Sequence, residues 1–323
     1  MRKISLRRKT AAGSGRNPAL TLLFVVGFLL VLYPVFGNLW NAYRQQRLSN
    51  TYEAEVENLT QDEYADEWAA AEAYNAANSP IWVPDAFSDE EVEADEEYES
   101  LLNVAGDGIM GYLEIPKIDI KIAIYHGTSD EVLTKGAGHL HGSSLPVGGE
   151  GTHAVIAAHR GLPSAPLFTD LDLLEIGDQF YLYVLDEVLA YEVDQILIVE
   201  PDETESLVQM PGEDYVTLVT CTPYGVNTQR LLVRGHRVEY TVERYEEEAD
   251  KSTSSMATNY VLVALLGLLT VAVASVLIRM YYRRKAERAA AGNVDAAGNE
   301  ATAKENRDTV TSKSENPAAG GDS

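Results

Sequence analysis

The one cysteine of this 323-residue chain, Cys221, ends a segment whose residues alternate as they do in a β-strand. The segment YVTLVTC is rich in β-branched and aromatic residues, and Pro223 and Gly225 directly after it predict a loop. A second strand is expected over residues 230–240, so Arg230 would face Cys221 at roughly 5 Å if the strands pair. A fixed positive charge beside a thiol favours the thiolate and can stabilise an oxyanion. The spacing therefore indicates a nucleophilic thiol with a cationic partner.

His159 is the candidate general acid or base. It follows a predicted strand at residues 152–158 and precedes a loop that contains Gly161 and Pro163. A histidine at the end of a strand can exchange protons near neutral pH. A single histidine is more often an ordinary polar residue, so its position alone leaves both interpretations open.

The other histidines give weaker patterns. His139 and His141 would share one face of an extended GHLHG segment, which would suit two metal ligands. No cysteine or carboxylate cluster completes such a site, so the sequence predicts no metal ion. His126, His153 and His236 carry no independent signal. The chain has neither a P-loop nor a dinucleotide fingerprint, so no cofactor is expected.

The residues around Cys221 resemble a known signature. The segment Thr217–Cys221, TLVTC, looks like the TLxTC motif of sortases, the surface transpeptidases of Gram-positive bacteria. The continuation from Thr222 to Arg237 is similar to the class C, or pilin-polymerising, branch of that family. The cysteine-to-arginine spacing of the family is intact across this match.

The resemblance assigns a role to each candidate. It implies that Cys221 is the nucleophile, that Arg230 stabilises the oxyanion, and that His159 protonates the leaving amine and then deprotonates the incoming one. Arg234 shares the strand parity of Arg230, so spacing alone does not choose between the two arginines, and the resemblance chooses Arg230. Arg234 and Arg237 are then expected to have structural or charge-balancing roles.

A lid is also expected from the resemblance. Class C sortases carry a segment ahead of the barrel whose Asp-Pro-aromatic motif enters the active site. Asp85-Ala86-Phe87 resembles that motif, with alanine in place of the middle proline, and Pro84 lies one residue too early to replace it. Asp85 and Phe87 are therefore the expected lid residues, and a flexible linker is the alternative.

The charge distribution excludes one class of partner. The formal net charge is −25, and the acidic residues gather in the middle of the chain while basic residues flank both ends. Residues 48–106 contain no lysine or arginine. Nucleic-acid binding needs basic patches, so no nucleic-acid partner is expected.

Two apolar segments predict a membrane partner. Residues 17–43 carry no charge, and a span of about 20 residues is enough to cross a bilayer. The second segment, Tyr260–Ile278, is followed directly by basic residues. The positive-inside rule then predicts that both termini are cytoplasmic and that residues 44–257 lie on the extracellular side of the cell membrane. A cleavable signal peptide and a removed sorting tail are the alternatives; no LPxTG-like sequence precedes the second segment.

Many short strands with turn signals between them predict a mostly β fold, either a closed barrel or a sandwich. The resemblance favours an irregular closed sortase-type β-barrel with short helices, flanked by two transmembrane helices. The expected organisation is a basic cytoplasmic N-terminus (1–16), a transmembrane anchor (17–43), an acidic linker and lid (44–106), a catalytic barrel (107–245), a linker (246–258), a second transmembrane helix (259–279) and a disordered cytoplasmic tail (280–323).

The resemblance implies a membrane-anchored cysteine transpeptidase. Such an enzyme would cleave an LPxTG-like sorting signal through a thioacyl intermediate and join pilin subunits by lysine isopeptide bonds. Its partners would be pilins or other surface proteins with sorting signals. The alternatives are a housekeeping sortase that uses a cell-wall precursor, and a non-enzymatic anchored barrel in which Cys221 is structural.

Overall fold

The structure is a computed structural model that describes residues 18–78, 83–88, 95–162, 165–250, 265–267, 269–288 and 301–303. The chain divides into two compact units, one formed by Leu32–Tyr260 and the other by Met1–Val31 with Val261–Ser323. The expected N-terminus at 1–16, and most of the expected linker at 246–258 and tail at 280–323, lie outside the described residues.

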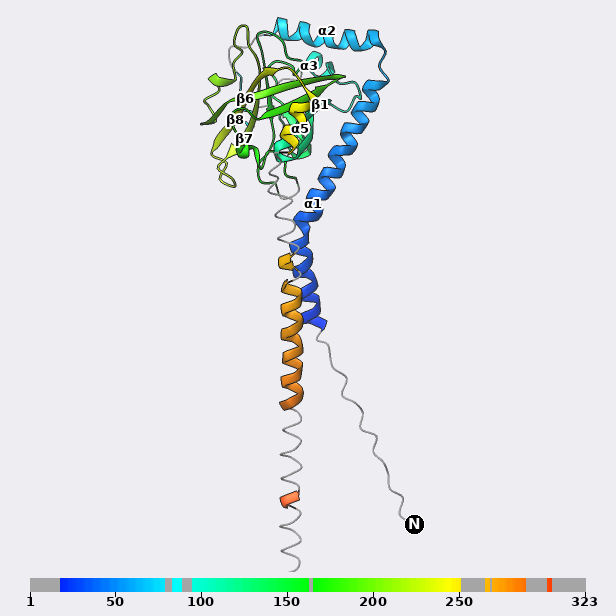
Figure 1. Ribbon diagram of the computed structural model, residues 1–323, viewed down its shortest axis with the longest axis vertical. Coiled ribbons are helices and arrows are strands. Elements are labelled where there is room, and N and C mark those ends of the chain that lie inside the picture. Colours follow the sequence, from blue (N-terminus) through cyan, green and yellow to red (C-terminus); the bar gives the residue numbers. More distant parts are fainter. Residues whose placement is uncertain are drawn as a thin grey trace, which may run out of the picture. The chain divides into compact units, whose positions relative to one another are not determined.

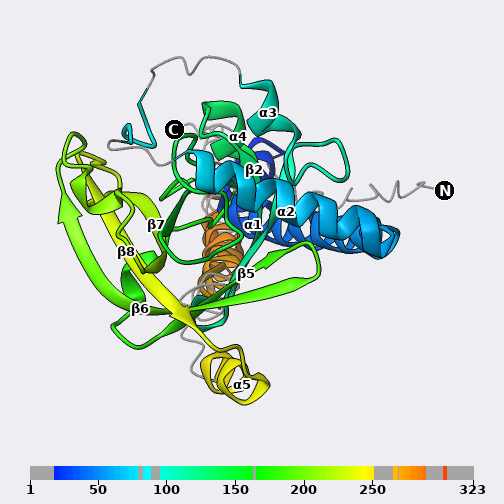
Figure 2. The same ribbon diagram turned by 90° about the horizontal axis from the view of Figure 1, so that it is seen from above.

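Eight strands close into a barrel within the unit Leu32–Tyr260 (Figures 1 and 2). The strands are β1 (Ile109–Ile115), β2 (Ile120–His126), β3 (Ala137–His139), β4 (Thr152–Ala157), β5 (Gln179–Val184), β6 (Glu187–Val199), β7 (Asp214–Thr222) and β8 (Gln229–Val238). Their order around the barrel is β1-β2-β3-β4-β7-β8-β6-β5, and β5 pairs with β1 to complete the ring. The β2–β3 and β4–β7 pairs are parallel, and the others are antiparallel. The prediction of a mostly β, closed barrel is confirmed.

Aromatic side chains fill part of the barrel interior and set a requirement for glycine. Phe180 on β5 and Tyr191 on β6 are fully buried and stack with their ring centroids 5.7 Å apart. A Cβ at Gly235 on β8 would lie 2.7 Å from the Phe180 ring and 2.9 Å from the Cβ of Tyr191. Any side chain at position 235 would collide with the stacked pair, so glycine allows the strand to approach it.

Short helices connect and flank the strands. They are α2 (Gln61–Ala77), α3 (Glu96–Ser100), α4 (Asp130–Lys135) and α5 (Val242–Asp250), with single 3₁₀ turns at Pro116–Ile118, Leu171–Leu173 and Glu205–Leu207. Two of the helix starts follow from capping side chains: Asp95 accepts a hydrogen bond from the Tyr98 amide of α3, and Ser129 accepts one from the Val132 amide of α4.

The longest helix, α1 (Pro18–Glu57), contributes a buried stripe to the barrel unit. Its buried residues there recur every three or four positions, as one face of a helix requires: Asn41, Gln45, Ser49, Tyr52 and Val56. The Tyr52 hydroxyl donates to the carbonyl of Met110 and accepts from the amide of Leu185. Gln45 accepts from the amide of Ala123. Backbone groups of the barrel thus have partners on α1, which is part of the folded unit.

Helix α2 begins at a capping box and ends against the barrel. Thr60 and Glu63 exchange hydrogen bonds at its first turn. Near its end, the side chain of Asn75 donates from Nδ2 to the carbonyl of Leu145 and accepts at Oδ1 from the Leu145 backbone amide. Residues 44–77, which belong to the expected acidic linker and lid at 44–106, are therefore largely helical and packed on the barrel (Figure 1).

Among the described residues, one helix, Leu265–Arg288, is long and apolar enough to cross a membrane. It corresponds to the second of the two predicted spans. The first predicted span forms the amino-terminal part of α1, an unbroken helix of 40 residues. Its assignment as a membrane anchor stays a prediction.

Candidate active site

Three adjacent strands bring the predicted site residues to one end of the barrel. In the parallel pair β4–β7, Ala157 lies opposite Val219. His159 and Cys221 are each two residues further along, so His159, just past the end of β4, and Cys221, near the end of β7, lie at the same end of the barrel. Cys221 also lies opposite Arg230 in the antiparallel pair β7–β8. Because neighbouring strands are about 4.8 Å apart, the three residues converge.

Two hydrogen bonds keep the β4 and β7 chains together up to this point. The amide of Ala158 donates to the carbonyl of Val219 at 3.1 Å, and the hydroxyl of Thr220 donates to the carbonyl of Ala158 at 2.8 Å. Thr220 is fully buried. The backbone positions of His159 and Cys221 are therefore fixed relative to each other by the residues just before them.

Cys221 is buried, with 9 % of the residue exposed. Burial raises the pKa of the thiol, the positive charge of Arg230 opposes that increase, and the negative charge of Asp85 adds to it. Half-buried His159 shows the converse effect: burial lowers its pKa, and the carboxylate of Asp130 opposes the decrease. Both effects favour a neutral thiol beside a neutral imidazole in this arrangement.

Asp85 and Phe87 lie directly over these residues. Asp85 forms a two-pronged ion pair with Arg230, with Nε–Oδ1 and Nη2–Oδ2 distances of 2.8 Å and 2.7 Å. The guanidinium carbon of Arg230 is 5.1 Å from the centre of the Phe87 ring. The same ring lies 5.8 Å from the ring of His159. The Asp85 carboxylate therefore occupies the Nε and Nη2 donors of Arg230.

The neighbours of Phe87 on this segment pack against strands of the barrel. Val83 and Ala86 are each 2 % exposed and belong to a compact apolar cluster. The cluster also contains Ala157 of β4, Val219 of β7 and other buried residues. Ala86, which stands where the motif has proline, is thus a packed residue.

Arg234 has a different environment from Arg230, although both project from β8. It forms its own two-pronged pair with Asp194, at 3.0 Å and 2.8 Å. Its guanidinium carbon lies 4.1 Å from the centre of the Tyr215 ring. The spacing ambiguity between the two arginines is resolved in space, because Arg230 is the one opposite Cys221.

His139, His141 and His153 each have structural hydrogen-bond partners. His139 is fully buried and hydrogen-bonds to the Ser144 carbonyl, and its burial lowers its pKa to about 3. His141 pairs instead with Asp95 at 3.2 Å. His153 hydrogen-bonds to Thr217, and burial lowers its pKa to about 4. In the described part of the chain, no three His, Cys, Asp or Glu side chains are grouped to hold a metal ion.

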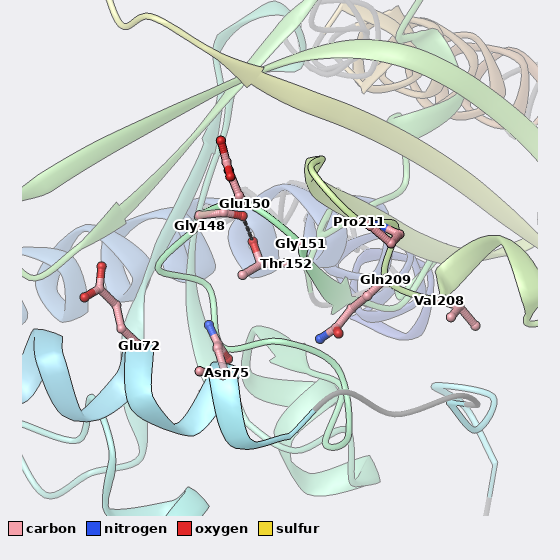
Figure 3. Close-up of a pocket in the computed structure, with 11 residues that line it drawn as sticks. Glu72, Asn75, Gly148, Glu150, Gly151, Thr152, Val208, Gln209 and Pro211 are labelled. Carbon is pink, nitrogen blue, oxygen red and sulfur yellow. Dashed lines mark hydrogen bonds between the residues drawn. The ribbon is translucent and has the colours of Figure 1, made fainter.

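A cavity of about 620 Å³ lies away from this site (Figure 3). It is bounded by Glu72 and Asn75 of α2, by the turn 148–152 and by Gln209. Thr152 is the first residue of β4, whereas His159 follows the last, so this cavity opens near the opposite end of the strand. The polar side chains of Asn75 and Gln209 are already hydrogen-bonded within the protein.

Comparison with known proteins places this arrangement in a family. A model described as the sortase domain matches residues 113–238. The chain is 26 % identical to sortase A of Bacillus anthracis over 217 residues, covering 67 % of this chain and 91 % of that protein. It is also similar to two solved structures. Sortase C of Streptococcus pneumoniae is 48 % identical with a TM-score of 0.57, covering 61 % of this chain and 98 % of that one. Sortase C-1 of Actinomyces oris is 45 % identical with a TM-score of 0.52, covering 55 % and 99 %.

These matches agree with the barrel and with the motif around Cys221. The similarity to sortase C structures spans nearly their whole length at well above 40 % identity. Sortases are cysteine transpeptidases, so the alternative of a non-enzymatic barrel is excluded. The chain therefore belongs to the sortase family of transpeptidases, in its class C branch.

Proposed function

We propose that this chain is a membrane-anchored transpeptidase that polymerises pilins. It would cleave an LPxTG-like sorting signal, hold the pilin as a thioester on Cys221, and pass it to a lysine amine of another pilin subunit. The observation that carries this proposal is the convergence of Cys221, His159 and Arg230 at one end of three adjacent strands. The sortase C of S. pneumoniae, to which the chain is similar, is described with pilin substrate specificity.

The first half-reaction forms the thioester. The sulfur of Cys221 attacks the threonine carbonyl carbon, and its proton passes to His159. Arg230 donates hydrogen bonds to the carbonyl oxygen as that oxygen becomes negative. The threonine–glycine C–N bond then breaks, and His159 gives its proton to the departing glycine amine.

The second half-reaction reverses these roles. A lysine Nζ attacks the thioester carbon while His159 accepts a proton from the amine, and Arg230 again donates to the oxyanion. The C–S bond breaks, the sulfur of Cys221 takes the proton back from His159, and an isopeptide bond remains between the two subunits. No cofactor or metal ion takes part in either step of this proposal.

The experiment that tests this function uses the full chain in detergent with a candidate pilin that carries a sorting signal. We expect covalent pilin ladders, and mass spectrometry should find a lysine joined to the threonine carbonyl at each junction. Joining to a cell-wall precursor amine without ladders would indicate a housekeeping sortase instead. Release of the signal with only water as acceptor would contradict the polymerase assignment.

We also propose that residues 83–88 act as a lid. The support is the pairing of Asp85 with Arg230 and the position of Phe87 against Arg230 and His159. Because the lid removes the Arg230 donors and adds a negative charge near the thiol, it keeps the resting enzyme inactive.

Opening the lid is expected to speed alkylation of Cys221. Replacing both Asp85 and Phe87 by alanine removes a charge that raises the thiol pKa and exposes the sulfur to solvent, which also lowers that pKa. Below the pKa, each unit of decrease gives about tenfold more thiolate. The rate of reaction with iodoacetamide should therefore rise, and its pH midpoint should fall.

The matched control for the lid is Asp194→Ala. This change breaks an equivalent two-pronged pair with Arg234 on the same strand but away from the thiol. Its alkylation rate should stay at that of the wild-type protein. Equal alkylation rates in the lid double variant and the wild type would show that residues 83–88 do not cover Cys221.

The proposed topology places both ends of the chain in the cytoplasm, because basic residues lie on the outer side of each apolar segment. It is tested with Ser5→Cys and Ser312→Cys in a Cys221→Ala background. In intact cells, both positions should be protected from an impermeant maleimide, whereas Asp202→Cys on the barrel should be labelled. Labelling of position 5 or 312 would contradict the two-span topology.

A further inference from the structure

The side chain next to His159 is placed unusually for a residue in a loop. Arg160 follows His159 directly, and its side chain is only 8 % exposed. Its guanidinium reaches three separate acceptors: Nε donates to the Thr169 carbonyl at 3.1 Å, Nη1 to the Thr222 hydroxyl at 3.2 Å, and Nη2 to Asp172 at 2.5 Å. One buried cation thus connects several parts of the chain.

These acceptors belong to the two segments that carry the catalytic candidates. Thr222 is the residue immediately after Cys221. Thr169 belongs to the loop that folds back on His159, where the amide of Phe168 donates to the His159 carbonyl at 3.1 Å. Through one guanidinium, the loop beside His159 is therefore fastened to the strand end beside Cys221.

The packing around the guanidinium supports the same connection. The Tyr224 ring, two residues beyond Thr222, lies 6.0 Å from the guanidinium carbon of Arg160. It also lies against Gly161, where a Cβ would come within 3.0 Å of the ring and where φ is +81°. The glycine lets the segment after Cys221 approach the loop after His159 closely.

We propose that Arg160 is a positioning residue: its guanidinium sets the imidazole of His159 at the distance from the thiol of Cys221 that proton transfer requires. The proposal rests on the function proposed above. Arg160 touches neither the reacting atoms nor the substrate, and it acts through its two neighbours. A misplacement of about 1 Å in such a pair can cost about 10²-fold in rate.

Arginine is suited to this position and lysine is not. The three acceptors surround a planar group, and each takes a different nitrogen of the fork. A lysine offers one nitrogen on a flexible stem and cannot reach the Thr169 carbonyl, Asp172 and Thr222 in the same arrangement. The conservative change Arg160→Lys should therefore keep the charge and lose the connection.

The test compares Arg160→Gln and Arg160→Lys with a matched control, Arg234→Gln. Arg234 is another partly buried arginine with a carboxylate partner, but it contacts neither Thr222 nor the loop after His159. Each change is made in the full chain carrying Asp85→Ala, so that the lid does not limit the rate. The readouts are kcat and KM for a fluorogenic sorting peptide, together with Tm.

Both Arg160 variants should lose about 10²-fold in kcat. Their KM should stay within about threefold, because peptide binding is not what the guanidinium supports. Arg234→Gln should lower Tm by a similar amount but leave kcat unchanged. A kcat for Arg160→Gln equal to that of Arg234→Gln, or a loss that appears in KM rather than in kcat, would overturn the proposal.

A smaller change covers the case in which Arg160→Gln does not fold. Thr222→Val removes only the hydroxyl that accepts from Arg160 and should lower kcat by about tenfold, the value of one hydrogen bond near 1.4 kcal/mol. If Thr222→Val folds and keeps the kcat of its parent, the proposal is wrong. The proposed function has its own test: peptide cleavage by a Cys221→Ala chain would contradict it. Cleavage that requires Cys221 but is unchanged in the Arg160 variants would overturn only the positioning role.

Discussion

Replacing Cys221 by alanine is expected to abolish both cleavage of the sorting peptide and pilin polymerisation. The chain contains no other cysteine, so no neighbouring thiol can take over the attack. Cys221 lies opposite Arg230 of β8 and two residues beyond Val219, the last residue of β7 that pairs with β4. A thioester to the pilin should therefore be detectable by mass spectrometry in the wild-type chain and absent from the variant.

The fold should survive this change. Alanine is smaller than cysteine, the sulfur makes no disulfide, and the strand continues to Thr222 through backbone hydrogen bonds that do not depend on the side chain. The circular dichroism spectrum and Tm should remain close to those of the wild type. Ladder formation at the wild-type rate by a folded Cys221→Ala chain would end the cysteine mechanism.

Arg230→Lys is expected to lower kcat for transpeptidation by about 10²–10³-fold, although the positive charge is kept. A guanidinium presents two parallel donors to one oxyanion, as it presents them to Asp85 in the resting structure, and an ammonium cannot reproduce that fork. The same substitution weakens the hold on the lid. Alkylation of Cys221 should therefore become faster in the variant while transpeptidation becomes slower, and the two rates should be measured on the same preparation.

Arg234→Lys is the control for this pair of effects. Arg234 makes the same type of two-pronged contact, with Asp194, on the same strand. Its replacement should change Tm but neither rate. A larger loss of kcat from Arg234→Lys than from Arg230→Lys would show that the oxyanion role belongs to Arg234 and not to Arg230.

The strand that carries Cys221 and the next strand, which carries Arg230, could be predicted because their patterns lie close together in the sequence. Alternation over YVTLVTC and the short loop after it define the two strands and nearly fix their pairing. The parallel pairing of β4 with β7 could not be predicted in this way, because it joins segments about sixty residues apart. The position of His159 beside Cys221 depends on that long-range pairing.

The parts of the site that the sequence did not predict involve side chains whose role depends on distant partners. Asp194 pairs with Arg234 and not with Arg230, yet no pattern near Asp194 in the sequence predicts this contact. Most of the buried stripe of α1 lies in a segment that the sequence suggested as a linker. Its burial depends on hydrogen bonds that Gln45 and Tyr52 make with backbone groups of the barrel, which are distant in the sequence. Arg160 likewise gives no signal until Thr222 and Asp172 are seen beside it.

Under the lid proposal, the segment that pairs Asp85 with Arg230 competes with the substrate for the site. A segment attached to the same chain competes at an effective concentration that is of millimolar order for short connections. A free sorting signal at micromolar concentration therefore binds with an apparent dissociation constant increased by the inverse of the open fraction. A signal held beside the enzyme in the same membrane would have a high local concentration, comparable with the effective concentration of the lid, and could compete with the lid for the site. The enzyme would then select substrates by proximity as well as by sequence, a difference that cleavage rates of free and tethered peptides would reveal.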